Sequence, residues 1–310
     1  MNSSRRVFLA QASVAAGAVL LTKHFGSAAL GGQPGETIAG TSNALVIYHT
    51  NSTNGNMGPV HKTLGGLRQI NTHLKNEGNS ALLLDAGNFF NTRMSFEQQK
   101  AVATIMNSTG YKAAGISGLD ISDDGRHLKA LAPYMEFSLI NCNHRFTPGL
   151  KSFIKPYRIF KNGAIKIGVT AVCTPLKGAT YINAIDCANR TTRFLKENEG
   201  CQLVICLSDL GPKRQESELN DQMLAEASEH IDMIIGNDHG KLQLNDAVWR
   251  NKLKHEVVFS AAAVKGLTMG KTVFNFTEDK QKKGVSVEHI IPGKPAGQNF
   301  AAALRQLSLA

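Results

Sequence analysis

The 310-residue sequence predicts an α/β fold. Short runs rich in β-branched residues alternate with segments whose apolar residues recur at helical spacing, which is the pattern of strand-helix-strand units. Apolar residues make up 42% of the chain and charged residues 19%, so the chain can bury a large core. Composition therefore excludes a disordered or fibrous protein, and the length allows one large domain or two.

The expected elements follow one another in order after residue 43. Strands are expected where short apolar runs occur, at residues 44–50, 81–84, 112–116, 137–141, 157–160, 165–172, 203–207, 233–235, 256–260, 271–276 and 285–291. Helices are expected at the longer periodic segments, residues 64–76, 96–107, 125–135, 189–199 and 221–229. Asn162-Gly163 suits the positive φ angles of a tight turn, so the strands on either side of it should form a hairpin.

The N-terminal segment resembles a twin-arginine (Tat) export signal. Arg5-Arg6 precede Val-Phe-Leu, an apolar stretch covers residues 10–21, and a small-residue run follows at 26–29. The apolar stretch is too short to span a bilayer, which needs about 20 residues. We therefore expect residues 1–29 to be a Tat signal peptide, 30–43 a Gly-rich linker and 44–310 one domain. The protein should then be periplasmic or otherwise extracytoplasmic, without a membrane span after cleavage.

Much of the positive charge belongs to this segment. The formal net charge of the chain is +10, and removal of Arg5, Arg6 and Lys23 leaves 31 − 24 = +7. The remaining basic residues are scattered, and no basic stripe is interleaved with aromatic residues. The sequence thus predicts no nucleic-acid partner.

The five cysteines predict buried thiols rather than disulfides. Cys142, Cys173 and Cys206 lie in apolar, strand-like runs, where a free thiol acts as a small hydrophobic group. Cys187 and Cys201 flank the helix expected at 189–199, whose length would keep them too far apart to bond. No CxxC spacing indicates a zinc site or a redox motif.

Polar motifs follow five of the expected strands. They read HTNSTNG at 49–55, LDAGN at 84–88, GISGLD at 115–120, LSDLG at 207–211 and IIGNDHG at 234–240. Ligands of α/β proteins bind outside the carboxyl ends of the strands. The five motifs are therefore the candidate functional site.

In frame and order these motifs resemble those of the 5′-nucleotidase family N-terminal domain, within the calcineurin-like metallophosphoesterases. The family pattern is HTND-x-HG, LDAGD, GNHEFD, LSHLG and GGH-x-H. The resemblance covers roughly residues 45–276. It implies a four-layer α/β/β/α sandwich in which two divalent cations activate a hydroxide that attacks a phosphate ester.

Most of the family's metal-binding residues are replaced. The replaced positions are Ser52 and Asn54 in the first motif, Asn88 in the second, Ile116 and Ser117 in the third, Asp209 in the fourth and Asn237 in the fifth, whereas Asp120 of the third motif and His239 of the fifth keep the family's residue. Asn88 stands where the family has the aspartate that bridges both metals, and Ser117 where it has the catalytic histidine. Two cations about 3.5 to 4 Å apart need an anionic oxygen between them, and an amide carries no charge.

We therefore expect a pseudoenzyme without a metal cofactor, which works through binding or assembly. An alternative is a remodelled hydrolase of phosphate monoesters or nucleotides, with one divalent ion (Mg, Mn, Ca or Zn) on Asp209, Asp238 and His239. A third interpretation is that the pocket binds a nucleotide or phosphate without cleaving it.

Several polar residues near the motifs are expected to be structural. His49, Asn51 and Asp85 should hold the loops, Asp120 should cap the helix expected at 125–135, and His144 should lie at the pocket rim. The resemblance also implies a C-terminal nucleotide-binding domain, for which the 310 residues leave no room. We expect a separate polypeptide to supply it if the protein meets nucleotides.

Overall fold

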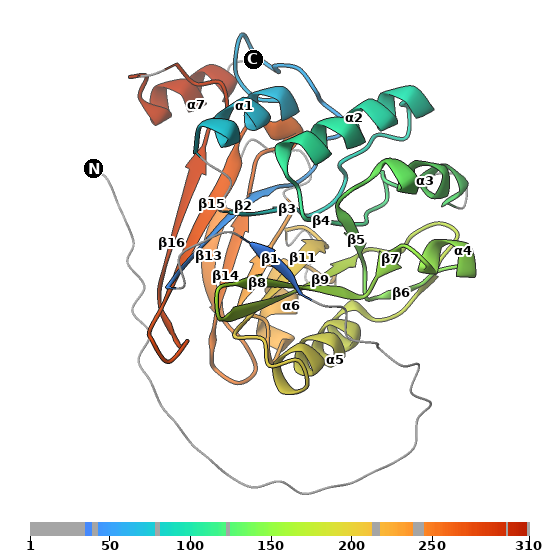
Figure 1. Ribbon diagram of the computed structural model, residues 1–310, viewed down its shortest axis with the longest axis vertical. Coiled ribbons are helices and arrows are strands. Elements are labelled where there is room, and N and C mark those ends of the chain that lie inside the picture. The colour runs from blue at the N-terminus through green and yellow to red at the C-terminus, as the bar shows by residue number, and fades with distance from the viewer. Residues whose placement is uncertain are drawn as a thin grey trace, which may run out of the picture.

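The computed structural model describes residues 35–38, 43–77, 81–121, 125–212, 218–237, 245–295 and 297–308. Within these ranges the chain forms two seven-stranded sheets that pack face to face, with helices on their outer faces (Figure 1). The expected Tat signal lies outside the described residues. None of the described helices is both long and apolar enough to cross a membrane.

The first sheet has the strand order β16-β15-β2-β3-β4-β5-β7. Its strands are β2 (Ala44–Thr50), β3 (Leu82–Asp85), β4 (Ala113–Gly115), β5 (Ser138–Ile140), β7 (Ile154–Lys155), β15 (Met269–Phe276) and β16 (Lys282–Ile290). The strands from β2 to β7 are parallel, and β15 and β16 extend the sheet as an antiparallel hairpin. The carboxyl ends of the parallel strands therefore lie along one edge of the sheet.

The second sheet has the order β1-β8-β9-β11-β12-β14-β13. Its strands are β1 (Glu36–Ile38), β8 (Tyr157–Asn162), β9 (Ile165–Cys173), β11 (Leu203–Asp209), β12 (Met233–Ile235), β13 (Asn245–Arg250) and β14 (Glu256–Ala261). Strands β9, β11, β12 and β14 are parallel. Strands β8 and β9 form the hairpin that Asn162-Gly163 predicted.

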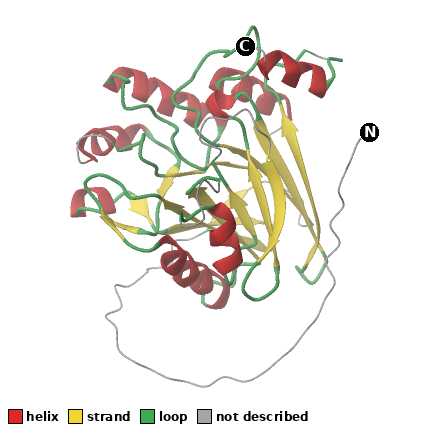
Figure 2. Cartoon of the chain, turned by 180° about the vertical axis from the view of Figure 1, so that it is seen from behind, coloured by secondary structure: helices red, strands yellow, loops and turns green. Residues whose placement is uncertain are grey.

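Helices cover the outer face of each sheet (Figure 2). On the first sheet lie α1 (Leu67–Glu77), α2 (Phe96–Thr109) and α3 (Arg126–Leu131), which continues into a 3-10 turn at Ala132–Tyr134. On the second lie α5 (Ala184–Glu197) and α6 (Asp221–Ala227). The remaining elements are α4 (Pro148–Lys151), α7 (Phe300–Ser308), a 3-10 turn at Val264–Gly266, and the antiparallel pair β6 (His144–Arg145) and β10 (Thr180–Tyr181).

The main core lies between the two sheets. Leu84 of the first sheet and Val169 and Ile205 of the second are fully buried in it. The opposite faces of the strands pack on the helices, so β3 and β11 are buried along their whole length. Burial on both faces explains why these strands read as almost continuous apolar runs. The described residues thus form the expected four layers, α/β/β/α.

Two boundary predictions are wrong. Residues 36–38, expected in a linker, form β1, because this segment pairs in parallel with β8 and buries Ile38. The helix expected at 189–199 begins at Ala184, because Asn183 caps it by accepting a hydrogen bond from the Asp186 backbone N–H. Cys187 consequently lies inside α5 rather than before it. All five cysteines are free thiols, as expected.

Candidate functional site

The loops after β2 and β3 run side by side. The backbone N–H groups of Ser52, Asn54 and Gly55 donate to the carbonyl oxygens of Gly87, Asn88 and Phe89, at N···O distances of 2.9, 2.9 and 2.8 Å. This ladder continues the β2-β3 pairing beyond the strand ends. It fixes two of the five motifs against each other.

One carboxylate joins these loops to the second sheet. Asp209, at the end of β11, accepts hydrogen bonds at the same oxygen, Oδ1, from the side-chain amides of Asn88 (2.9 Å) and Asn237 (2.6 Å). The Ser52 hydroxyl donates to Asn237 Oδ1 at 2.8 Å. We call Ser52, Asn88, Asp209 and Asn237 the amide cluster.

The amide cluster is shielded from solvent. Its most exposed member, Asn88, is only 7% exposed. Burial raises the pKa of Asp209 to about 6, while the hydrogen bonds from the two amides act in the opposite direction. Asn88 Oδ1 also accepts a hydrogen bond from the Leu119 backbone N–H. The polar atoms of the cluster thus find partners within it and in the loop after β4.

The backbone at three of the replaced positions is left-handed. Ser52, Asn54 and Asn88 have φ angles of 45°, 51° and 56°. Asparagine tolerates this region better than most residues, and serine does so less well. Such strain gathers at functional sites, where the surrounding contacts enforce it.

Asp120 holds loops together and does not cap a helix, so that expectation is wrong. Its Oδ2 accepts the backbone N–H groups of Asn88 (2.8 Å) and Ser117 (3.0 Å), and its Oδ1 accepts that of Phe90 (2.9 Å). Helix α3 instead begins after Gly125, which has no side chain to act as a cap. Burial raises the pKa of Asp120 well above its usual range, against the effect of these hydrogen bonds.

The two neighbouring positions of the third motif face different ways. Ile116 is buried in the core between the first sheet and its helices, so its side chain does not join the amide cluster. Ser117 is also fully buried. Its hydroxyl lies so close to Gly87 that a Cβ added to this glycine would come within 2.0 Å of the Ser117 Oγ. Ser117 therefore packs against the β3 loop beside the cluster.

Asp238 and His239 lie outside the described residues. Of the three residues in the alternative single-metal site, only Asp209 is therefore placed. Among the described residues, no group of three or more His, Cys, Asp or Glu side chains is arranged to hold a metal ion.

The residues expected to support the loops make specific contacts. His49 Nε2 lies 3.1 Å from the Ser260 hydroxyl, and Asn51 Oδ1 accepts the Ala262 backbone N–H. Asp85 Oδ2 accepts the Thr50 hydroxyl at 2.6 Å, and its Oδ1 accepts the Gly87 N–H. Burial raises the pKa of Asp85 to about 6.

Sequence reasoning missed a second cluster of buried polar side chains, which lies after β5 and at the end of β9. Asn141, Asn143 and Cys173 are buried there together with His144. His144 Nε2 accepts the Leu176 backbone N–H, so its Nδ1 carries the proton and faces Asn141 Oδ1 at 3.2 Å. The signal was the run NCNH directly after a strand.

No protein-family model matches the chain. Solved structures share its fold over most of its length. A 5′-nucleotidase precursor from Thermus thermophilus has a TM-score of 0.68 at 19% identity, over 86% of this chain and 58% of that one. The calcineurin-like phosphoesterase YfkN from Bacillus subtilis has a TM-score of 0.65 at 17% identity, over 86% and 96%. The fold is that of the calcineurin-like phosphoesterases.

A third structure with this phosphoesterase fold is the NAD nucleotidase of Haemophilus influenzae, with a TM-score of 0.68 at 17% identity, over 86% and 62% of the two chains. By sequence, the trifunctional nucleotide phosphoesterase protein YfkN is 24% identical over 237 residues, which are 62% of this chain and 15% of that protein. The chain thus spans a small part of that relative. The family resemblance predicted from the motifs is confirmed by these similar phosphoesterases and nucleotidases.

The described residues do not fit the pair of cations that the phosphoesterase fold implies. Of the amide cluster only Asp209 is a carboxylate, and both amide N–H groups that reach it present hydrogen atoms. A cation needs oxygen or nitrogen lone pairs, and a pair of cations needs anionic oxygen between them. Hydrogen-bond donors thus occupy one of the two carboxylate oxygens of Asp209.

Proposed function

We propose that this chain is a non-catalytic protein with the calcineurin-like phosphoesterase fold, which acts by binding or assembly. The observation that carries the proposal is the pair of amides, Asn88 and Asn237, that donate to one oxygen of Asp209. In the family such positions hold metal ligands. In this chain the side chains at these positions form hydrogen bonds with one another instead.

The chemistry of hydrolysis supports the same proposal. Attack on a phosphate ester near neutral pH needs an activated hydroxide, and bound divalent metals supply one by lowering the pKa of water to about 7. A general acid near the leaving group would also be needed, and Ser117, which takes the place of the family's histidine, has a hydroxyl in place of an acid-base imidazole. Among the described side chains no group is arranged to hold a metal ion, and Oδ1 of Asp209, the one carboxylate of the amide cluster, is covered by the two amides.

Phosphatase assays combined with metal analysis test this proposal. The full chain would be assayed with nucleoside monophosphates and p-nitrophenyl phosphate, each with Mg²⁺, Mn²⁺, Ca²⁺ or Zn²⁺, beside the Bacillus phosphoesterase as a positive control. We expect no turnover above that of the buffer and less than one equivalent of metal in the purified protein. Two equivalents of metal with turnover would overturn the proposal.

The same assays separate the single-metal alternative. One equivalent of metal, with turnover that both Asp209→Asn and His239→Ala abolish, would establish a remodelled hydrolase in place of a binding protein. Turnover that neither substitution changes would point to a contaminating enzyme. Asp279→Ala, at an exposed carboxylate in the turn between β15 and β16, is the control substitution.

We also propose export by the twin-arginine pathway, on the strength of Arg5-Arg6 and the short apolar stretch behind them. Replacing both arginines with lysine keeps the charge and should block export, so the uncleaved chain should accumulate inside the cell. Cell fractionation with an antibody against the chain measures this. Unchanged export of the double-lysine variant would contradict the proposal.

A further inference from the structure

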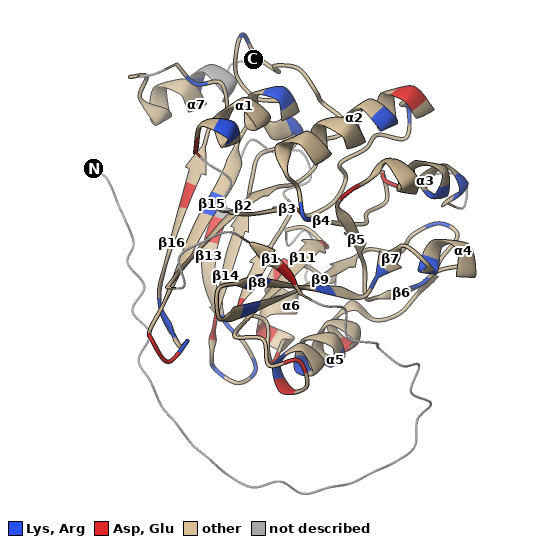
Figure 3. Ribbon diagram, in the orientation of Figure 1, with Lys and Arg blue, Asp and Glu red and all other residues tan. Residues whose placement is uncertain are grey.

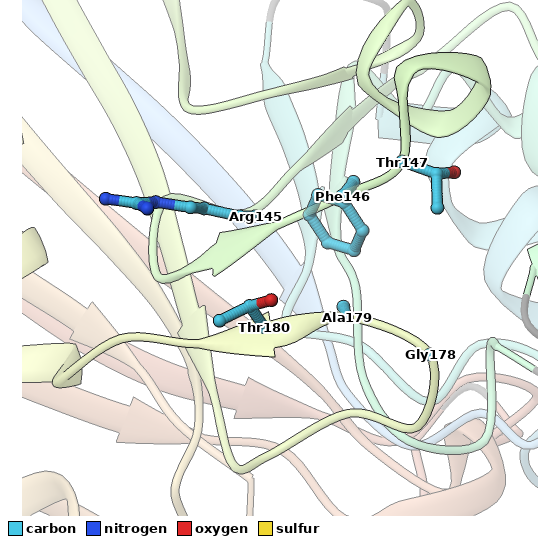
Figure 4. Close-up of a pocket in the computed structure, with 6 residues that line it drawn as sticks. All are labelled: Arg145, Phe146, Thr147, Gly178, Ala179 and Thr180. Carbon is cyan, nitrogen blue, oxygen red and sulfur yellow. The ribbon is translucent and has the colours of Figure 1, made fainter.

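A hollow of about 510 Å³ opens beside the β6-β10 pair. It is lined by residues 145–147 on one side and 178–180 on the other, and we call it the β6-β10 hollow (Figure 4). Its volume falls within the range of small-molecule sites, about 300–1,000 Å³, but the hollow is shallow and open, so a ligand there would keep much of its surface in solvent. The two lining segments follow β5 of the first sheet and β9 of the second, so the hollow lies beyond strand ends where α/β proteins bind ligands.

Buried hydrogen bonds hold both walls in place. Asn143 Oδ1 accepts the Cys173 backbone N–H at 3.0 Å, and its Nδ2 donates to the Cys173 carbonyl at 2.9 Å. The His144 ring accepts the Leu176 N–H at 3.2 Å, and the Ile182 N–H donates to the Asn143 carbonyl. A site formed before the ligand arrives loses little entropy on binding.

The polar groups of the hollow are available to a ligand. The Arg145 side chain is exposed and makes no hydrogen bond or ion pair with any described residue. The hydroxyls of Thr147 and Thr180 likewise make no hydrogen bond within the described part of the chain, and Thr147, the N-cap residue of α4, makes no capping hydrogen bond with its side chain. Arg145 and Thr180 are cross-strand partners, and a planar guanidinium beside a hydroxyl suits a carboxylate or phosphate group.

The surrounding charge is also positive. Lys129 lies against Gly149 of α4, and Lys151 and Lys155 follow the lining segment 145–147 in the chain. The blue segments around α3, α4 and β7 in Figure 3 mark this side of the molecule. Lys177 adds a further positive charge directly beside Gly178. Such a field attracts anions and raises their rate of association.

The hollow also has an apolar wall. The Phe146 ring projects between β6 and the turn at Gly178 and Ala179 (Figure 4), and it is partly exposed. A partly exposed aromatic ring can stack on a flat ligand group, which contributes about 0.5–1.5 kcal/mol beyond the area it buries.

We propose that the β6-β10 hollow binds a small organic anion that carries a flat apolar group. The anionic group pairs with Arg145 and the hydroxyl of its cross-strand partner Thr180, and the flat group packs on Phe146 and Ala179. This ligand class extends the proposed function, because it gives the binding role a site apart from the amide cluster, but it holds whether or not the chain is catalytic.

Calorimetric titration of the full chain at low ionic strength tests the proposal. The probes are phenyl phosphate and benzoate, which represent phosphate esters and carboxylates, with benzyl alcohol as the neutral analogue. We expect one equivalent of at least one anion to bind, benzyl alcohol not to bind, and added salt to weaken the binding. Binding of only one anion identifies which acidic group the site prefers. Equal binding of the neutral analogue, or no binding of either anion, overturns the proposal.

Variants locate the site. Arg145→Ala should weaken anion binding about tenfold or more, and Phe146→Leu severalfold. Arg68→Ala, an exposed arginine on α1, is the matched control and should bind as the wild type does. Circular dichroism verifies that each variant is folded. Unchanged affinity in folded Arg145→Ala rejects the hollow as the site.

Phosphate release in the same phenyl phosphate samples keeps the two proposals separate. Release of phosphate would overturn the non-catalytic function and leave the hollow standing if Arg145→Ala still weakens benzoate binding. Loss of the Arg145 effect without phosphate release would remove the hollow and leave the non-catalytic function standing.

Discussion

At the residue scale, one carboxylate organises much of the candidate site. Asp120 accepts three backbone N–H groups, two from the loop after β3 and one from the loop after β4. The resemblance places this residue next to a catalytic histidine, where it would orient the ring. In this chain both of its oxygens are occupied by the backbone, so its role is to position the loop that holds Asn88.

Asp120→Ala should therefore destabilise the protein strongly. The change leaves three buried N–H groups without an acceptor, and each costs about 1–3 kcal/mol, so we expect a loss of at least 3 kcal/mol in the free energy of unfolding. Urea titration measures this. Asp279→Ala, at an exposed carboxylate, should cost less than about 0.5 kcal/mol. Similar losses in the two variants would contradict the role assigned to Asp120.

His49 makes stability depend on pH. Burial lowers its pKa to about 3, from 6.5 in an unfolded chain. As the pH falls below 6.5, His49 binds a proton in the unfolded state but stays neutral in the folded state. Acidification therefore lowers the stability of the folded protein. Between pH 7 and pH 5 this linkage costs about 2 kcal/mol.

Replacement of the His49 imidazole should remove this pH-dependent contribution to stability. We expect the gap in stability between the wild type and His49→Gln to change by about 2 kcal/mol between pH 7 and pH 5, in favour of the variant at pH 5. Asp85 and Asp209, whose pKa values are raised to about 6, act in the opposite direction in both proteins and cancel in the comparison. A gap that stays constant with pH would show that His49 does not titrate in this way.

At the element scale, β2 and β15 approach closely where they flank the site. Gly270 of β15 pairs with His49, and a Cβ on Gly270 would come within 2.1 Å of His49 Nε2. The imidazole thus occupies the space that a side chain would need. A glycine at this position lets the ring reach Ser260 on the other sheet.

Gly270→Ala should cost about 3 kcal/mol or more, because the methyl group overpacks a fully buried ring. The matched control is Gly284→Ala in β16 of the same hairpin, where an added Cβ meets no atom within 4 Å. We expect thermal unfolding to show a clear drop for Gly270→Ala and little change for the control. Equal shifts would indicate that the general effect of replacing glycine, and not the contact with His49, sets the cost.

The elements differ in how well the sequence predicts them. Strands such as β2, β11 and β12 are apolar runs flanked by polar loops, so local pattern located them. The start of α5 was missed although Ala184, Cys187 and Ala188 are buried at helical spacing, and the Asn183 cap becomes clear only from its hydrogen bond. Strand β13 was missed because its local sequence contains polar residues and does not indicate a strand. Only its pairing with β14 in the folded chain makes it one.

The candidate site, like the elements, was predicted from the sequence only in part. The motifs predicted which positions lie at the strand ends, because the chain order of strands and loops is local information. They did not predict that Asn88 and Asn237 donate to the same oxygen of Asp209, since these residues meet only when the two sheets pack. The inward packing of Ile116 depends on the same tertiary contacts.

At the scale of the whole molecule, polar contacts tie the two sheets together at several places. The amide cluster joins the loops after β2 and β3 to β11 and the end of β12. Lys282 of β16 pairs with buried Asp232, just before β12, and His289 of β16 lies 3.0 Å from Asp246 of β13. In a protein of this fold with bound cations, metal ligation would contribute to that connection. Here hydrogen bonds and ion pairs provide it.

Stability should therefore not respond to metal chelation. We expect the same melting temperature in EDTA and in buffer with Mg²⁺, Mn²⁺ or Zn²⁺, because the residues of the amide cluster gain nothing from a cation. A metal bound at 100 times its dissociation constant would add about 2.7 kcal/mol. A melting temperature that falls by several degrees in EDTA would contradict this expectation.

The left-handed backbone of Ser52, Asn54 and Asn88 has a consequence for the protein's history. Each such residue costs of order 1 kcal/mol or more, and the loops keep this geometry although no ligand is needed to enforce it. Their course is fixed by the ladder between the loops and by Asp120, both of which act through the backbone. Side chains at these positions can therefore change without rebuilding a loop, so chelating residues could be lost, and regained, by point substitution alone.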